Sequence, residues 1–173
     1  MIETDLEQIF DALNGHRVRY LVVGGLAVAA HGHPRFTADV DLVIALDREN
    51  ALRTIQALGG LGYHPLAPVS PDAFADASVR HGWIEEKGMM VFQWLSAQRP
   101  ETPIDLFVQE PFDFEAEYAI APRMELAAGR SVPVVSYATL IAMKESARRP
   151  KDLEDITNLG YIHQKPAAPD TDA

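Results

Sequence analysis

The chain has 173 residues, a formal net charge of −10, 47% apolar residues and no cysteine. This length suits one domain with a sizeable core, and the missing thiols exclude disulfides, cysteine nucleophiles and zinc-finger ligation. The acidic balance argues against broad non-specific binding of nucleic acid, which relies on Lys and Arg, although a local basic groove stays open. No apolar stretch is long enough to span a membrane and no secretory signal is recognised, so we expect a soluble, cytoplasmic protein without a membrane partner.

Helices and strands are expected to alternate along the chain, because some apolar residues recur with helical spacing and others form short β-branched runs. Thr4 and Glu7 have the spacing of a capping box, and Asp47, Ser136 and Pro150 are placed to open later helices. The order of segments favours an α/β (α+β) domain with a small mixed β-sheet flanked by helices. Helices are predicted over 4–15, 26–31, 47–60, 136–143 and 150–159, part-helical structure over 74–87, irregular structure over 65–71, strands over 18–23, 39–46, 89–95 and 102–108, and an edge strand over 132–135.

No internal repeat and no linker divides the sequence. Residues 1–163 are therefore expected to form a single domain. Residues 164–173 are predicted to be a disordered tail.

Three aspartates carry the strongest chemical signal. Asp39 and Asp41 lie two residues apart on a predicted strand, so both point to one face while their apolar neighbours pack behind them. Asp105 lies on another predicted strand. Charge in such an apolar run needs a partner, and carboxylates are preferred ligands of a hard divalent cation. We therefore predict a metal site built from these three residues.

A glycine pair, Gly24 and Gly25, precedes a predicted helix and adds to this signal. Without a Cβ, glycine lets backbone amides approach a ligand, and a helix N-terminus favours a phosphate. The alternative is a plain strand-to-helix turn. The pair belongs neither to a Walker loop nor to a dinucleotide fingerprint, because the Gly-Lys-Ser/Thr ending and the third glycine are absent.

Together, Val23 to Gly32 and Arg35 to Leu42 resemble the signature of the DNA polymerase β-like nucleotidyltransferase superfamily. The Arg-x-Thr-x-Asp-x-Asp form, Lys144 and the segment 149–156 are similar to minimal nucleotidyltransferases of the AbiEii toxin type and of the aminoglycoside or lincosamide type. The likeness spans residues 18–159. The chain lacks room for the C-terminal acceptor domain of larger members, so acceptor recognition would use a second subunit or residues 65–87.

This resemblance implies a magnesium-dependent transfer of a nucleoside monophosphate from an NTP to a hydroxyl, with release of pyrophosphate. Asp39 and Asp41 would hold two Mg²⁺ ions, and Asp105 would act as a ligand or base. Lys144 matches a phosphate-contacting lysine, its alternative being a solvated side chain. Arg35 and Thr37 would contact phosphates or fix their loop.

Other residues favour structural roles. Trp83 with its basic neighbours Arg80 and Lys87 is predicted to be packed rather than nucleotide-facing. His31 and His33 lack further ligands at zinc spacing. Lys151, Asp152 and Asp155 belong to a charge-rich helix start, which is interpreted as ordinary surface chemistry in which the acids suit the helix dipole and brace the helix.

Three readings of the function stay open. The acceptor could be a small cationic molecule, such as an antibiotic, which suits the acidic chain. It could instead be RNA or a protein, as for a toxin. The third reading is a non-catalytic, antitoxin-like partner protein. The expected partners are an NTP, an unidentified acceptor, and a second copy of the chain or a cognate protein.

Overall fold

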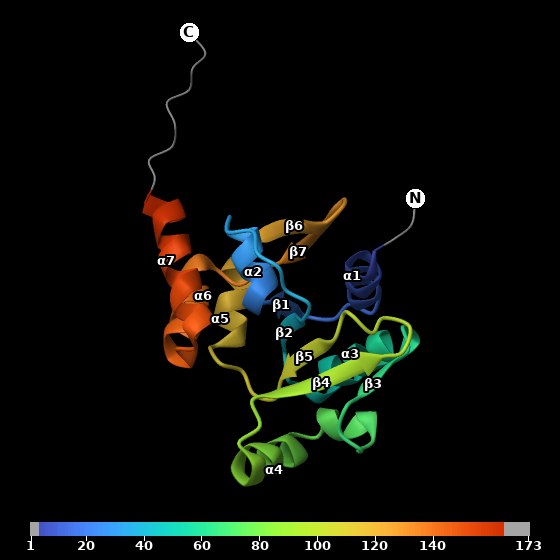
Figure 1. The fold of residues 1–173 in the computed structure, drawn as a ribbon. Coiled ribbons are helices and arrows are strands. Elements are labelled where there is room, and N and C mark those ends of the chain that lie inside the picture. Colours follow the sequence, from blue (N-terminus) through green and yellow to red (C-terminus); the bar gives the residue numbers. More distant parts are fainter. Residues whose placement is uncertain (1–3, 165–173) are drawn as a thin grey trace.

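The computed structural model describes residues 4–164 as helices and strands layered around one mixed sheet (Figure 1). Both ends of the described chain lie at the same end of the molecule, and α4 lies at the opposite end (Figure 1). The elements in chain order are α1 (Asp5–Gly15), β1 (Tyr20–Val22), α2 (Gly24–Ala30), β2 (Val40–Ile44), α3 (Arg48–Gly60), β3 (Tyr63–Pro65), the 3₁₀ helix η1 (Pro71–Ala75), α4 (Ala77–Lys87), β4 (Val91–Ser96), β5 (Ile104–Phe107), α5 (Phe114–Ile120), β6 (Arg123–Ala127), β7 (Arg130–Pro133), α6 (Tyr137–Ala147) and α7 (Pro150–Gln164).

The five-stranded sheet has the order β1-β2-β5-β4-β3. Strands β2 and β5 run parallel, whereas the other neighbouring pairs run antiparallel, so the predicted mixed sheet is confirmed. The register places Asp41 opposite Asp105 and Asp105 opposite Gln93. Three polar residues on three adjacent strands therefore form one row across the sheet.

Alternation along β4 shows how the sheet divides core from site. Phe92 and Trp94 are buried, while Val91, Gln93 and Leu95 on the other face are half-buried. The ring of Trp83 stacks on Phe92 with a centroid distance of 4.6 Å, which confirms that this tryptophan is packed. Because side chains alternate between faces, the polar row lies on the face opposite this aromatic core.

The predicted first helix is confirmed, including its capping box. The backbone N–H of Glu7 donates to Thr4 Oγ1 at 3.3 Å, and the Thr4 N–H donates to the Glu7 carboxylate at 2.5 Å. The helix ends at Gly15 as expected. Each reciprocal bond satisfies a backbone or side-chain group that would otherwise lack a partner.

The predicted edge strand over 132–135 is wrong in its pairing. Strand β7 pairs with β6 in a separate hairpin, and only an isolated bridge joins Val134 to Val22 of the main sheet. The prediction failed because β6, with its mostly half-exposed residues, lacks a clean alternation of buried and exposed positions. Strand β3 and helix α5 were also not predicted, although Asp113 caps α5 through a bond from the Ala116 N–H at 3.0 Å.

The remaining expectations concern the chain ends and the membrane. Of the tail predicted over 164–173, Gln164 is the last residue of α7, and the others lie outside the described residues. Within residues 4–164, no helix is both long and apolar enough to cross a membrane.

Candidate active site

The two strand aspartates meet at the centre of the sheet. Asp41 lies within β2 and Asp105 lies opposite it on the parallel neighbour β5. Asp39 precedes the first residue of β2. All three side chains are half-buried, and the two strand residues are electrostatically coupled to each other and to Asp39. The structure thus places Asp41 and Asp105 side by side, with Asp39 close enough to affect the pKa of both.

Burial and neighbouring acids raise the pKa of two of these carboxyl groups. Burial, followed by the charges of Asp105 and Asp39, raises the pKa of Asp41 to about 6. Burial also raises the pKa of Asp105, against the opposing effect of a hydrogen bond from Gln93. Crowded carboxylates raise their pKa when no cation offsets their mutual repulsion. A cation bound beside Asp41 and Asp105 would offset this repulsion.

The glycine pair serves Asp41 directly. A Cβ on Gly24 would lie 2.0 Å from Asp41 Oδ2, and the backbone φ of Gly24 is +63°. The N–H of Gly25 donates a hydrogen bond to the Asp41 side chain. A Cβ on Gly25 would lie 2.6 Å from Thr37 Oγ1. The structure thus uses these glycines to accommodate and orient an aspartate, and it adds this role to the predicted phosphate contact.

Arg35 and Thr37 hold the segment that leads into β2. Arg35 Nε lies 3.0 Å from Asp155 Oδ1, an ion pair without hydrogen-bond geometry. Thr37 packs against Gly25. These contacts match the alternative in which the two residues fix their loop, while a phosphate contact for either residue stays a prediction.

Lys144 is neither solvated nor directed at a free ligand position in this structure. Its side chain is 5% exposed, and Nζ donates to Asp152 at 3.2 Å and to Asp155 at 2.7 Å. The solvated alternative is therefore wrong. The ammonium neutralises two buried acids, so its predicted role in contacting phosphate has no support from this arrangement.

Two other cations of the same region act on the carboxylates. Burial raises the pKa of Asp41, and Lys151 opposes part of this rise. Asp41 in turn contributes to the raised pKa of Arg149, whose main cause is a hydrogen bond to Asp152. The Arg149 side chain is 63% exposed. These positive groups therefore lie near the aspartates and stay accessible to a ligand.

Magnesium chemistry fits these residues. No three His, Cys, Asp or Glu side chains within residues 4–164 form a preformed metal cage, so Asp39, Asp41 and Asp105 do not form the predicted three-residue metal site by themselves. Mg²⁺, however, is usually held by one or two carboxylates together with substrate phosphates and water. The adjacent Asp41 and Asp105 supply such a pair.

Sequence reasoning did not identify Gln93, Arg149 and Lys151 as site residues. Gln93 Nε2 donates to Asp105 Oδ1 at 3.0 Å, a contact set by the register of β4 and β5. The two cations lie in a charge-rich helix start that was interpreted as surface. The signal that could have identified them is a pair of cations on either side of Pro150, in a chain that has few positive residues.

A comparison with known protein families identifies the chain as a nucleotidyltransferase. A family model described as "Nucleotidyl transferase AbiEii toxin, Type IV TA system" matches residues 8–161, most of the chain. The chain belongs to this AbiEii nucleotidyltransferase toxin family, so the predicted superfamily and enzyme class are confirmed. A search of the curated proteins finds no match.

Solved structures of antibiotic-modifying proteins share the fold. A solution structure of the antibiotic-resistance factor ANT(2'')-Ia has a TM-score of 0.59 and 17% identity, covering 91% of this chain and 82% of that chain. A crystal structure of ANT(2'')-Ia with adenylyl-2''-tobramycin has a TM-score of 0.58 and 17% identity, covering 91% and 87%. The lincomycin-bound lincosamide antibiotic adenylyltransferase LnuA has a TM-score of 0.56 and 16% identity, covering 92% and 98%. At these identities the likeness shows the fold.

Proposed function

We propose that this protein transfers a nucleoside monophosphate from an NTP to a hydroxyl group of an acceptor, as the toxin of a type IV toxin–antitoxin system. The acceptor oxygen forms a bond to the α-phosphorus, the bond between that phosphorus and the bridging oxygen breaks, and pyrophosphate leaves. The hydroxyl proton passes to a carboxylate or to water. The cognate antitoxin is the expected protein partner.

The alignment of Asp41 with Asp105 is the observation that carries this proposal. Two coupled carboxylates on neighbouring parallel strands provide adjacent positions for the nucleotide and for the attacking hydroxyl. Burial first, and neighbouring acids next, raise the pKa of both carboxyl groups, which supports a site that takes up a cation. Because phosphoryl transfer is catalysed mainly by positioning and charge neutralisation, such an arrangement suits the reaction.

The residues take separate roles in the proposal. Asp39 and Asp41 would hold Mg²⁺, which neutralises developing charge on the phosphates and lowers the pKa of the attacking hydroxyl. Asp105 would complete the metal site or accept the proton. Arg149 and Lys151, which lie near Asp41, replace Lys144 as the cations expected to face the triphosphate.

The test is a search for the product. Purified protein is incubated with each labelled NTP and Mg²⁺, together with separate pools of tRNA, protein and small hydroxylated compounds, and mass spectrometry identifies whatever gains a nucleotide. We expect one acceptor class to gain a nucleoside monophosphate with matching release of pyrophosphate. The pool that reacts distinguishes a small-molecule acceptor from RNA or protein.

Variants tie this activity to the site. Asp41→Asn and Asp105→Asn should remove transfer, and Gly24→Ala should do so because its methyl group would occupy the position of the Asp41 carboxylate. Gly88→Ala, at an exposed position with a similar φ of +60° and open space around its Cβ, is the matched control for backbone strain. Transfer that persists in Asp41→Asn and Gly24→Ala would contradict the proposal.

A further inference from the structure

Gln93 is the one polar side chain of a strand that is otherwise apolar up to its last residue. Strand β4 reads Val-Phe-Gln-Trp-Leu-Ser, and Gln93 lies between the half-buried Val91 and Leu95. Its amide Nε2 donates to Asp105 Oδ1 at 3.0 Å. An amide among apolar neighbours forfeits the packing that a β-branched residue would give, so its presence calls for a specific partner.

Strand pairing does not require this side chain. The backbone ladder already joins β4 to β5 over four residue pairs, and the carbonyl of Gln93 accepts from Leu66 N–H at 2.9 Å on the other side. The amide therefore adds nothing to the hydrogen-bonded register of the sheet. Its contact acts on the carboxylate of Asp105.

A neutral donor has a particular consequence for this carboxylate. Lysine or arginine at the same position would orient Asp105 but would also cancel the charge that a metal ion needs. An amide restricts rotation of the carboxylate while leaving its charge in place. The N–H of Gly25 does the same for Asp41 on the other side of the pair. Each of the two aligned carboxylates thus receives a hydrogen bond from an uncharged donor.

We propose that Gln93 is a positioning residue of the transfer reaction, which holds the Asp105 carboxylate in the orientation needed to complete the metal site or receive the hydroxyl proton. This inference rests on the proposed function, because it presumes that Asp105 acts in transfer. Gln93 works through Asp105 rather than by contact with the phosphates. Its loss therefore affects turnover more than nucleotide affinity.

The central variant is Gln93→Met, which keeps the length and unbranched shape of the side chain and removes the donor. Turnover is expected to fall by about 10- to 100-fold, the size of effect that follows from misplacing a reacting group. The KM for the NTP should stay within about threefold of the parent, since the nucleotide is held by other groups. Gln56→Met, at an exposed position of α3, is the matched control and should change neither quantity.

A second readout needs no acceptor and no turnover. In ¹⁵N-labelled protein, Asp105→Asn should shift the side-chain amide resonance of Gln93, and addition of Mg²⁺ with a non-hydrolysable NTP should shift it in the parent. The amide resonance of Gln56 should stay in place in both experiments. If the Gln93 resonance shifts in neither experiment, the positioning contact is absent in solution and the inference is overturned. This test does not depend on whether Gln93→Met folds.

The two proposals fail in distinguishable ways. Parental turnover in Gln93→Met, together with loss of turnover in Asp105→Asn, would overturn the role of Gln93 and leave the proposed function intact. Parental turnover in Asp105→Asn would overturn the catalytic assignment of Asp105 and with it any need to position that residue. A rise in KM without a fall in kcat for Gln93→Met would place Gln93 in nucleotide binding and overturn its positioning role.

Discussion

Asp41 shows at the scale of one residue that the site favours function over stability. Its pKa is raised to about 6, by burial first and by the charges of Asp105 and Asp39 next. A folded state with a raised carboxyl pKa binds protons that the unfolded chain has already lost. This contribution to stability is complete below the ordinary carboxyl pKa, and it is lost as the pH rises through about 6.

We therefore expect Asp41→Asn to stabilise the metal-free protein at pH 7, because asparagine cannot carry the uncompensated charge. The gain should be on the order of 1–3 kcal/mol in the free energy of unfolding, after allowance for partial exposure, and it should disappear near pH 4. Urea unfolding of both proteins at a series of pH values measures it. Asp76→Asn is the control of opposite sign, since hydrogen bonds from Ser78 lower the pKa of Asp76. A loss of stability in Asp41→Asn at pH 7 would show that the carboxylate is compensated in the free protein.

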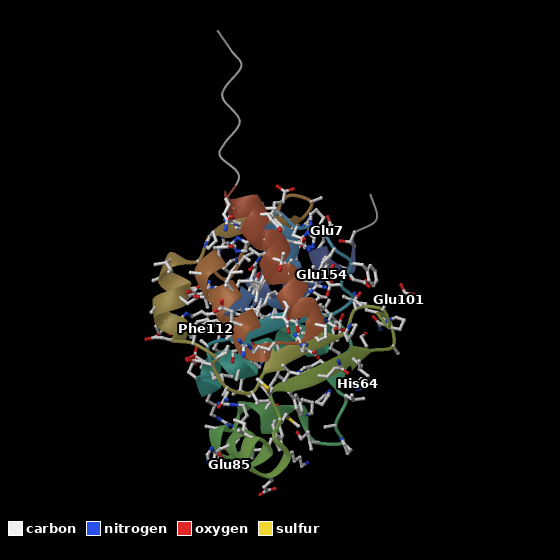
Figure 2. The ribbon with its side chains drawn as sticks, turned by 60° about the vertical axis from the view of Figure 1, so that its left-hand side comes forward. Glu7, His64, Glu85, Glu101, Phe112 and Glu154 are labelled. Atoms are coloured by element: carbon white, nitrogen blue, oxygen red, sulfur yellow. The ribbon has the colours of Figure 1, made fainter. Side chains whose placement is uncertain are left out.

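At the scale of elements, buried ion pairs join α6 and α7 to the segment before β2. Figure 2 brings these two helices forward and shows Glu154 on α7. Lys144 of α6 binds Asp152 and Asp155 of α7, and Asp155 in turn faces Arg35. Burial opposes ionisation of Asp152, but hydrogen bonds from Arg149 and Lys144 outweigh it and lower its pKa. The packing of α6 and α7 thereby places Arg149 and Lys151 near Asp41 of the candidate site.

Removing the ammonium group of Lys144 should destabilise the packing of α6 against α7. We expect Lys144→Met to lower the free energy of unfolding by about 3–5 kcal/mol, because Asp152 and Asp155 would be left buried without their shared partner. Chemical denaturation measures the change, and Lys87→Met at an exposed position of α4 serves as control. A variant as stable as the parent but with weakened NTP binding would instead restore Lys144 to the phosphate site.

At the scale of the whole molecule, several positive side chains of this acidic protein lie in the region of the candidate site. The protein carries a formal charge of −10, yet Arg35 and Lys144 both pair with Asp155, and Arg149 and Lys151 both interact electrostatically with Asp41. A free triphosphate is repelled by the carboxylates, whereas its magnesium complex offers them a counter-ion. Nucleotide binding should therefore depend on the metal.

We expect Mg²⁺ with a suitable NTP to raise the melting temperature by several degrees. A ligand at 100 times its Kd stabilises the folded state by about 2.7 kcal/mol, and the nucleotide would contact residues from several helices and strands. Thermal unfolding with each NTP, with Mg²⁺ or with a chelator, measures the effect and reveals which base is preferred. Asp41→Asn should lose the shift. The same shift in chelator, or none with any NTP, would contradict a metal-dependent nucleotide site.

Much of the fold could be predicted from local patterns. The capping box of Thr4 and Glu7, the apolar runs and the glycine stops identified most helices and strands, because capping and side-chain periodicity act between residues close in sequence. Strand β6 and its pairing with β7 escaped prediction, since a half-exposed hairpin depends on its distant partner α1 and on Val22 rather than on its own alternation.

For the site, the sequence by itself determined the chemistry: three aspartates, a glycine pair before a helix, and a pattern that belongs to one family of nucleotidyltransferases. Only the tertiary structure decided which groups meet. The strand register brought Gln93 to Asp105, burial turned Lys144 from a phosphate contact into the partner of two acids, and the packing of α7 brought Arg149 and Lys151 near Asp41. Such contacts join residues far apart in the chain, and their energies depend on desolvation and distance, which no local pattern encodes.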